Sequence, residues 1–215
     1  MTDVIGRDLV RRAGELKSAL AKGAADRDRA RVFPLEEIRK VRDAGITAAL
    51  VPRRFGGPGA TFEELVDVIL ALAEADPNIA QCLQPHFALQ DVLRLYGSEE
   101  QQTRYLGEIA DGAIITNALA ERGGKFIGDI ATQAIPDGSG YRLDGTKYYC
   151  TGSLAADGFW TLSLTPEGER LIAIVGADQA GVRLEDDWDA MGQRTTASGT
   201  VHLEGVRVVG AAVIE

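Results

Sequence analysis

Apolar and polar positions alternate with a helical period in the first half of the chain. The clearest stretch has apolar residues three and four positions apart, at Phe62, Leu65, Val66, Ile69, Leu72 and Ala73. Just before this run, Thr61 and Glu64 have the spacing of a capping box, in which each side chain bonds the backbone amide of the other residue. The pattern predicts a helix that begins after Thr61.

Four further segments of this half carry helix signals, such as an N-cap residue before proline, a capping box or a closing glycine. They are Ile5 to about Ala25, Pro34–Ala44 closed by Gly45, the segment that starts at Asp76-Pro77 and runs through Ile79–Tyr96, and the start at Ser98 with Gln101. Residues 1–110 are therefore expected to form an all-α N-terminal domain.

The period changes after Asp111-Gly112, where short β-type runs follow one another between Asp-Gly, Gly-Ser-Gly and Pro-Glu-Gly turns. These runs are Ala113–Asn117, Ile130–Ile135, Thr146–Cys150, Leu171–Val175 and Thr200–Val208. Sixteen of the 25 glycines lie after residue 110, as a turn-rich β region requires. We expect residues 111–215 to form an antiparallel β-barrel or sandwich, which makes the chain a two-domain α+β protein.

Charge and composition narrow the possible partners. The chain has 23 Lys and Arg against 32 Asp and Glu, a net charge of −9, which argues against nucleic acid or an anionic membrane surface as the main partner. No apolar run approaches the roughly 20 residues of a membrane span, and the N-terminus shows no signal-peptide core. We expect a soluble, cytoplasmic protein. With two cysteines and two histidines, no metal site is expected.

His86 is the first candidate for chemistry. It follows Pro85 inside an otherwise helical stretch, and a proline kink would turn the next side chain toward the cavity that the kink faces. The alternative is a packed, hydrogen-bonded core histidine. The other histidine, His202, alternates with apolar neighbours and is expected to face solvent without a role.

Thr151 is the second candidate, at the end of the strand that follows the Asp144-Gly145 turn. Its hydroxyl and amide either face a cofactor or only satisfy the strand end. Cys150, beside it, is expected to be a small buried residue rather than a nucleophile. Trp160 and Trp188 are expected to be core aromatics.

Nucleotide hydrolysis, dinucleotide binding by a Rossmann fingerprint and serine hydrolysis find no support, because the corresponding glycine motifs are absent from the sequence. Two glycine clusters remain. Gly56-Gly57-Pro58-Gly59 and Gly123-Gly124-Lys125 either let the backbone approach an anion or are surface turns.

The order of several short motifs resembles the acyl-CoA dehydrogenase superfamily over nearly the whole chain. These motifs are Val51-Pro52-Arg53-Arg54-Phe55-Gly56-Gly57-Pro58-Gly59, Tyr96-Gly97-Ser98-Glu99-Glu100-Gln101 with Tyr105-Leu106, Asp144-Gly145-Thr146-Lys147, Met191-Gly192-Gln193-Arg194 and Val201-His202-Leu203-Glu204-Gly205-Val206-Arg207-Val208. The resemblance implies a helical domain and a β-domain that together hold one face of an isoalloxazine ring.

One segment distinguishes two branches of that superfamily. The dehydrogenases carry a Thr-Glu-Pro-x-Ala-Gly-Ser-Asp-like stretch, whereas residues 117–129 keep the glutamate and the final aspartate, have Arg122 in place of proline, lack the serine and are two residues longer. This segment, His86 and the Tyr-Cys-Thr-Gly-Ser strand end resemble instead the flavin-dependent monooxygenase branch, the dibenzothiophene monooxygenase-like proteins.

That resemblance implies a reaction. Members of the branch take reduced FMN from a separate flavin reductase, form a C4a-hydroperoxyflavin with O2 and transfer one oxygen atom to sulfur or nitrogen of a small organosulfur or amine substrate. FAD is the alternative cofactor. By the same resemblance Thr151 stabilises the oxygenated flavin near N5 and His86 acts beside it as an acid or base.

The resemblance also implies which residues line the flavin and which segment covers it. Asn117, Ala118, Ala120, Tyr149, Cys150 and Thr151 would contact the flavin, largely through backbone groups. The glycine-rich stretch from Leu119 to Ile130 is expected to form a lid that excludes water from the site.

Members of the family continue into a C-terminal four-helix bundle that completes the flavin pocket and forms most of a homotetramer interface. This sequence stops at the end of the β-domain, so we expect a partial enzyme that is inactive alone. Two other functions stay open: an FAD-dependent acyl-CoA dehydrogenase, and a catalytically inactive flavin-binding or interaction fragment.

Overall fold

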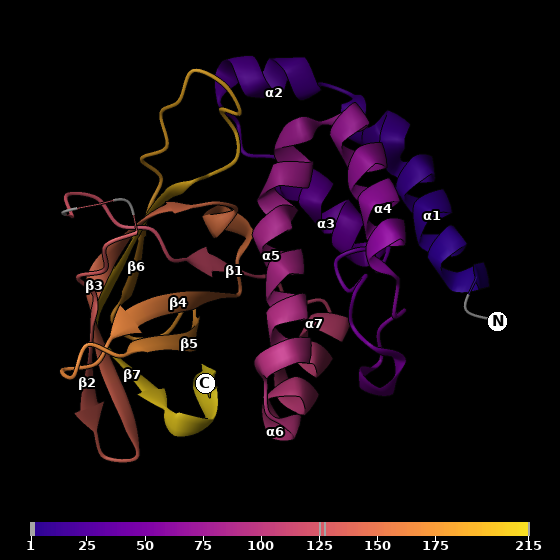
Figure 1. Ribbon diagram of the computed structural model, residues 1–215. Helices are drawn as coiled ribbons and strands as arrows, with labels where there is room; N and C mark the ends of the chain where they lie inside the picture. Colours follow the sequence, from indigo (N-terminus) through magenta and orange to yellow (C-terminus); the bar gives the residue numbers. More distant parts are fainter. Residues whose placement is uncertain (1–2, 125, 127, 215) are drawn as a thin grey trace.

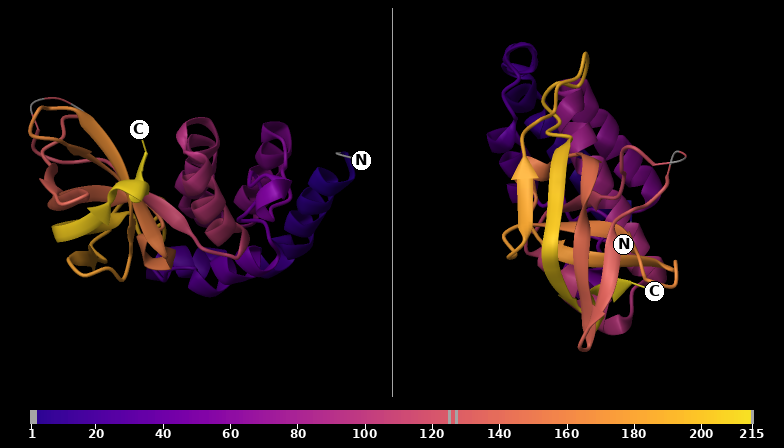
Figure 2. Two further views of the ribbon diagram at one scale, coloured as in Figure 1. Left: turned by 90° about the horizontal axis from the view of Figure 1, so that it is seen from below. Right: turned by 90° about the vertical axis from the view of Figure 1, so that its left-hand side faces the viewer.

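The structure, a computed structural model, describes residues 3–124, 126 and 128–214 and places a row of helices beside a β-sheet (Figure 1). Figure 2 shows the N-terminus at the far end of the helical row and the C-terminus close to where helices and sheet meet. The predicted fold class, helices followed by a mainly antiparallel β region, is confirmed.

Apart from two short 3-10 turns in the β half, η3 (Ser153–Ala155) and η4 (Gly210–Ala212), the helical elements lie within residues 3–110. They are α1 (Asp3–Ala21), α2 (Ala24–Ala30), α3 (Leu35–Asp43), the 3-10 turn η1 (Arg53–Phe55), α4 (Phe62–Ala75), α5 (Pro77–Tyr96), α6 (Glu99–Gln101), the π-helical turn η2 (Gln102–Leu106) and α7 (Gly107–Ala110). Within the described ranges, no helix combines the length and apolar character needed to cross a membrane.

Three predicted helix starts are confirmed by their cap hydrogen bonds. Thr61 and Ser98 each form a reciprocal capping box, with Glu64 and Gln101 respectively, and the Asp76 side chain accepts from the Asn78 amide. The long predicted helix over residues 5–25 is shorter: α1 ends at Ala21, and Gly23 at φ 74° starts a new helix, α2.

The strands form one eight-stranded sheet in the order β6-β7-β3-β2-β4-β5-β8, with β1 paired to β4. They are β1 (Ile115–Ala118), β2 (Gln133–Asp137), β3 (Gly140–Cys150), β4 (Gly158–Leu164), β5 (Arg170–Gly176), β6 (Val182–Glu185), β7 (Gly199–Val209) and β8 (Val213–Ile214). Sequence periodicity missed β4, β6 and β8. The pairings of β1 and β2 with β4 are parallel, so the sheet is not wholly antiparallel as expected.

Three hydrophobic clusters hold the structure together. One lies within the helices around Leu72 and Ile79, and another within the sheet around Phe159 and Val201. The third joins the two parts, because α5, η2 and α7 contribute Leu89, Leu106 and their neighbours while β1 and β5 contribute Ile115 and Ile174. Burial of this mixed cluster fixes the sheet against the helices.

Gln101 adds a polar link across the same junction. Its side-chain amide donates to the carbonyl of Ala211 at 3.2 Å and to that of Val213, residues that lie 110 and 112 positions away in sequence. The end of α6 is thereby bonded to β8 and to the segment before it, which Figure 1 shows next to α6.

Candidate flavin site

Strand β1 places Asn117 on the sheet face that looks toward the helices. Asn117 is paired in register with Trp160 of β4, and neighbours in register present their side chains on the same face. Ile115, two residues before Asn117, and Trp160 both pack in the mixed cluster between sheet and helices. Among the described residues, Asn117 Oδ1 and Trp160 Nε1 are buried without a hydrogen-bond partner. An unpartnered acceptor and donor on one sheet face are free to bond a polar group such as water or a ligand.

A bulge at the end of β3 directs Tyr149 out of the strand. The register with β7 shifts between Lys147 and Cys150, and Tyr149 has φ 59°, in the left-handed region that non-glycine residues rarely adopt. Tyr148 leaves the main ladder and pairs with Ala120, while the Tyr149 side chain is 46% exposed. The bulge thus turns one predicted flavin contact outward and ties another, Ala120, to β3.

Thr151, just past the bulge, lies in a cluster of small hydroxyl residues. Its Oγ1 is 2.9 Å from Ser198 Oγ, and its carbonyl accepts from the Thr116 hydroxyl of β1. The next residue, Gly152, has φ 78°, and a Cβ there would lie 2.7 Å from the Cys82 carbonyl of α5. Only glycine therefore lets the strand end approach the helix so closely.

His86 lies on α5, which continues through Pro85 as a single helix, and it is fully buried. The Ile115 amide donates to Nδ1 at 3.1 Å, so Nε2 carries the proton and donates to the Thr47 carbonyl at 3.0 Å. Burial lowers the pKa of His86 to about 4, against weaker opposing effects of these backbone contacts. A neutral imidazole here joins the segment at Thr47, α5 and the start of β1.

Two of the predicted flavin contacts have side chains inside the sheet core. Ala118 and Cys150 have no exposed surface and belong to the cluster around Phe159, so only their backbone groups can reach a ligand. Burial raises the pKa of the Cys150 thiol to about 12, which keeps it protonated. The expectation that Cys150 is buried is confirmed, and its lack of a nucleophilic role stays a prediction.

A cavity of about 770 Å³ is lined by two of the predicted flavin contacts, Ala120 and Tyr149. Its walls come from the predicted lid, from the end of β3 and from β4 and β5: Leu119, Ala120, Glu121, Arg122, Gly123, Gly124, Phe126, Gly128, Ile130, Tyr149, Leu162 and Arg170. Leu162 shares one face of β4 with Trp160, but neither Trp160 nor Asn117 lines the cavity itself. Lys125 and Ile127, which also belong to the predicted lid, lie outside the described residues.

The guanidinium of Arg122 covers one side of this cavity. Its central carbon lies 4.4 Å from the ring centre of Tyr148 and 4.8 Å from that of Tyr149, and Tyr149 in turn meets Trp188 edge to face. Trp188 is therefore half-buried at the site rather than a core residue as expected. The Trp188 indole donates to the Gln193 carbonyl at 2.9 Å.

A buried ion pair fixes the base of the lid. Lys147 Nζ, with no exposed surface, lies 2.5 Å from Glu121 Oε1 and also donates to the carbonyls of Leu119 and Leu162, at 3.4 and 2.5 Å. The Glu121 carboxylate accepts in addition from the amides of Ala131 and Thr132. The chain at both ends of the lid segment is thus bonded to this ion pair: Leu119 to Lys147, and Ala131 and Thr132 to Glu121. Sequence motifs contained Glu121 and Lys147, but nothing in the sequence pattern signalled that they pair.

Burial and the ion pair act in opposite directions on the pKa values of Lys147 and Glu121. Burial lowers the pKa of Lys147 more than Glu121 raises it. For Glu121, burial raises the pKa, but the hydrogen bonds from Lys147, Thr132 and Ala131 outweigh it, so the net pKa lies below the ordinary value. Each group depends on the other, because an unpaired charge in this position would be strongly destabilising.

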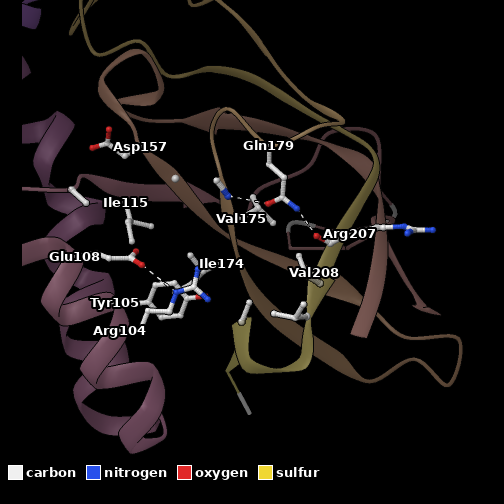
Figure 3. Close-up of a pocket in the computed structure, with 15 residues that line it drawn as sticks. Arg104, Tyr105, Glu108, Ile115, Asp157, Ile174, Val175, Gln179, Arg207 and Val208 are labelled. Carbon is white, nitrogen blue, oxygen red and sulfur yellow. Dashed lines mark hydrogen bonds and ion pairs between the residues drawn. The ribbon is translucent and has the colours of Figure 1, made fainter. Parts of the chain in front are cut away.

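A second cavity, of about 260 Å³, lies where η2 and α7 meet β4, β5 and β7 (Figure 3). Arg104 donates to Glu108 at 3.1 Å, and Gln179 links the Gly176 amide to the Arg207 carbonyl. None of the predicted flavin contacts, all of which the structure describes, lines this cavity. Of the predicted flavin contacts, Ala120 and Tyr149 line the larger cavity instead.

Comparison with known proteins decides the family. Residues 6–113 match the family model for the acyl-CoA dehydrogenase N-terminal domain. The chain belongs to the acyl-CoA dehydrogenase family.

Relatives within the family include enzymes of two kinds. The chain is 29% identical over 212 residues to a dibenzothiophene monooxygenase of Rhodococcus erythropolis, covering 96% of this chain and 51% of that protein. It is 31% identical over 202 residues to a probable medium-chain specific acyl-CoA dehydrogenase of Caenorhabditis briggsae, covering 89% and 49%. The chain thus spans about half the length of the curated relatives that it matches.

Among solved structures, FMN-bound TdsC from Paenibacillus sp. A11-2 superposes on this acyl-CoA dehydrogenase family chain with a TM-score of 0.91. Sequence identity is 28%, and the match covers 96% of this chain and 53% of TdsC. The arrangement of helices and sheet described above is therefore the arrangement found in a flavin-binding member of the family.

The residues present fit a flavin. The pyrimidine edge of an isoalloxazine offers an N–H donor between two carbonyl acceptors, and Asn117 Oδ1 and Trp160 Nε1 are an unpartnered acceptor and donor on one sheet face. The cavity lined by Ala120, Tyr149 and Leu162, of about 770 Å³, is in the size range of cofactor pockets. A family chain with this pair of orphaned atoms has the polar groups that such a ring needs.

Proposed function

We propose that this chain forms the flavin-binding helical and β portions of an FMN-dependent monooxygenase that acts on a small organosulfur or amine compound. The observation that carries the proposal is the match to dibenzothiophene monooxygenase and to FMN-bound TdsC over 96% of the chain. Dioxygen is the second substrate, and a separate flavin reductase supplies the FMN in reduced form. FMN, when bound, supplies the two electrons that activate dioxygen.

The chain's own residues hold and orient the ring. Asn117 and Trp160 would accept from and donate to its pyrimidine edge, and the backbone of Ala118, Ala120 and Cys150 would form the wall behind it. By the family resemblance Thr151 would place its hydroxyl against N5, and the strand end that carries it is fixed to β1 through the Thr116 hydroxyl. These contacts would hold the ring in one orientation before oxygen arrives.

His86 takes a different role from the acid or base implied by family resemblance. Both ring nitrogens bond backbone groups, and the side chain has no exposed surface. In this arrangement a proton could leave or reach the imidazole only after these bonds break. We therefore propose that His86 positions β1 through its bond to Ile115, which lies two residues before Asn117.

Exclusion of water falls to the lid segment and the residues around Tyr149. The lid is bonded at its base by the Glu121–Lys147 ion pair, and Arg122 stacks over Tyr148 and Tyr149 at the cavity wall.

We further propose that the complete enzyme is a cytoplasmic homotetramer. The support for the tetramer is the family resemblance. The exposed apolar stripe on α4 formed by Phe62, Val66 and Leu70 is a surface that another domain or subunit would cover.

A second candidate function is an FAD-dependent acyl-CoA dehydrogenase. The observation in its favour is the 31% identity to a probable member of that class. Against it stands the segment after β1, where Arg122 replaces the proline of the dehydrogenase pattern and stacks on two tyrosines.

One experiment separates the two functions. The full natural polypeptide is supplied with FMN, NADH, a flavin reductase and ¹⁸O-labelled dioxygen, together with a panel of sulfones, thiophenes and amines. We expect one labelled oxygen atom in the product, and no product when the reductase is omitted. Bleaching of the bound flavin by an acyl-CoA without oxygen would instead establish the dehydrogenase. If neither labelled product nor flavin bleaching is observed, the remaining function is an inactive flavin-binding or interaction module.

A further inference from the structure

Three buried hydroxyl groups lie end to end behind Thr151. Thr151 Oγ1 is 2.9 Å from Ser198 Oγ, which is 2.9 Å from Thr196 Oγ1. Thr196 Oγ1 lies 3.1 Å from the carbonyl oxygen of Gln193. The three side chains are buried, with 8%, 6% and 1% of their residue surfaces exposed in the order Thr151, Ser198, Thr196.

The carbonyl at the end of this row fixes its direction. A hydroxyl has one proton to donate, and a carbonyl can only accept. Thr196 must therefore donate to the Gln193 carbonyl, Ser198 must donate to Thr196, and Thr151 must donate to Ser198. This is the one arrangement that forms all three hydrogen bonds, and it leaves Thr151 Oγ1 with free lone pairs and no free proton.

A competing acceptor does not change this result. The Tyr149 carbonyl lies 3.5 Å from Thr151 Oγ1, much farther than Ser198. If Thr151 donated there, Ser198 would have to donate to Thr151, and the contact between Ser198 and Thr196 would lose its proton. The backbone also holds the two segments together, because the Gly152 amide donates to the Thr196 carbonyl at 2.8 Å.

We propose that Ser198 and Thr196 are positioning residues that make Thr151 a hydrogen-bond acceptor toward the flavin. The inference rests on the proposed function, in which Thr151 faces flavin N5. Reduced flavin carries a proton on N5, whereas oxidised flavin has only a lone pair there. An acceptor at this position therefore favours the reduced cofactor, which is the form that must bind before it meets oxygen.

The test compares affinities for the two forms of FMN rather than turnover. In the full natural polypeptide, the Kd of oxidised FMN is measured in air and that of reduced FMN under anaerobic conditions. Ser198→Ala frees the Thr151 proton to rotate toward N5. The ratio of oxidised to reduced Kd should fall about 2- to 10-fold, the effect of one net hydrogen bond. Thr196→Val should lower the ratio by a smaller factor. Thr196→Ser keeps the hydroxyl, so its ratio should equal the wild-type value.

Ser153→Ala is the matched control. Ser153 is also a buried hydroxyl beside this segment, and it donates to the Ala197 carbonyl at 2.8 Å without joining the row. Its ratio should stay at the wild-type value. Circular dichroism and thermal unfolding check that each variant folds, and Thr196→Val carries the test if Ser198→Ala does not.

Three results would overturn the inference: an unchanged ratio in Ser198→Ala, an equal change in Ser153→Ala, or no rescue by Thr196→Ser. If the parent protein binds both forms of FMN and the ratio is unmoved, the inference alone fails. If the parent binds neither form, the proposed function fails and the inference fails with it.

Discussion

Strand β1 is held at its two ends by buried polar groups of opposite character. At its start the Ile115 amide donates to the neutral ring of His86 at 3.1 Å. Just beyond its end the Leu119 carbonyl accepts from Lys147, a buried cation paired with Glu121. Asn117 lies between them. One short strand is thus fixed at one end by His86, which is kept uncharged by burial, and at the other by Lys147, whose charge is balanced by Glu121.

The two anchors differ in what they need. His86 needs only backbone partners, and the Thr47 carbonyl keeps a second donor, the Gln90 amide at 2.7 Å, if the imidazole is removed. Lys147 leaves three acceptors behind, one of them a carboxylate that is only 7% exposed. The charged anchor should therefore be far more sensitive to substitution than the neutral one.

Breaking the charged anchor should give the largest effect. Lys147→Met leaves the Glu121 carboxylate and two carbonyls unpaired, so we expect a loss of about 3–5 kcal/mol in the free energy of unfolding, measured by urea denaturation. Arg29→Met is the control, since its ion pair with Asp26 is largely exposed and should contribute less than about 1 kcal/mol. A loss below that control value in Lys147→Met would contradict the importance of the ion pair.

Lowering the pH should weaken the two anchors at different pH values, and this is the second largest effect expected. The pKa of His86 is lowered from 6.5 to about 4 in the folded chain, so the unfolded chain binds its proton first as the pH falls. The stability of the neutral anchor is complete above pH 6.5 and should decline toward pH 4, by up to about 3 kcal/mol. Glu121, with its pKa lowered, should lose its contribution only below its ordinary value of 4.5.

The measurement is unfolding by urea at half-unit steps from pH 7.5 to 4 in wild type and His86→Phe. The difference between the two should shrink steadily below pH 6.5, because only wild type contains this titrating group. Parallel curves across this range would mean that His86 is not held neutral by the fold.

Removing the neutral anchor at neutral pH should give the smallest of the three effects. His86→Phe keeps an aromatic ring of similar size but leaves the Ile115 amide without an acceptor, which costs about 1–3 kcal/mol for a buried donor. Denaturation at pH 7.5 measures it. A loss as large as that of Lys147→Met would show that the two anchors are equivalent after all.

Local signals in the sequence predicted most of the helical half. Capping boxes and N-caps act within four residues, so Thr61, Asp76 and Ser98 could be recognised without knowing what packs nearby. Strand β4 was missed because its polar residues are the buried ones: Thr161 and Ser163 have no exposed surface, whereas Trp160 is only partly buried, so polarity does not mark a solvent-facing side.

The site was harder to predict because its contacts are not local. Family resemblance brought Thr151 forward, but Ser198 is 47 positions away and the pairing of Glu121 with Lys147 spans 26. Only the fold brings such residues together. The proposal for His86 changed for the same reason: the Thr47 and Ile115 backbone groups that occupy its ring leave no trace in the sequence around it. His202, expected to face solvent, is only 19% exposed, beside Glu185.

The Gln101 amide has a consequence for the order of folding during synthesis. Its acceptors, the carbonyls of Ala211 and Val213, lie 110 and 112 residues downstream, so they reach the ribosome exit long after α4 and α5 have emerged. The helical half can pack its own core while the later strands are still being made. Until then the Gln101 side-chain amide at the end of α6 lacks these two acceptors, and the synthesis of β8 completes the bonding between the two halves.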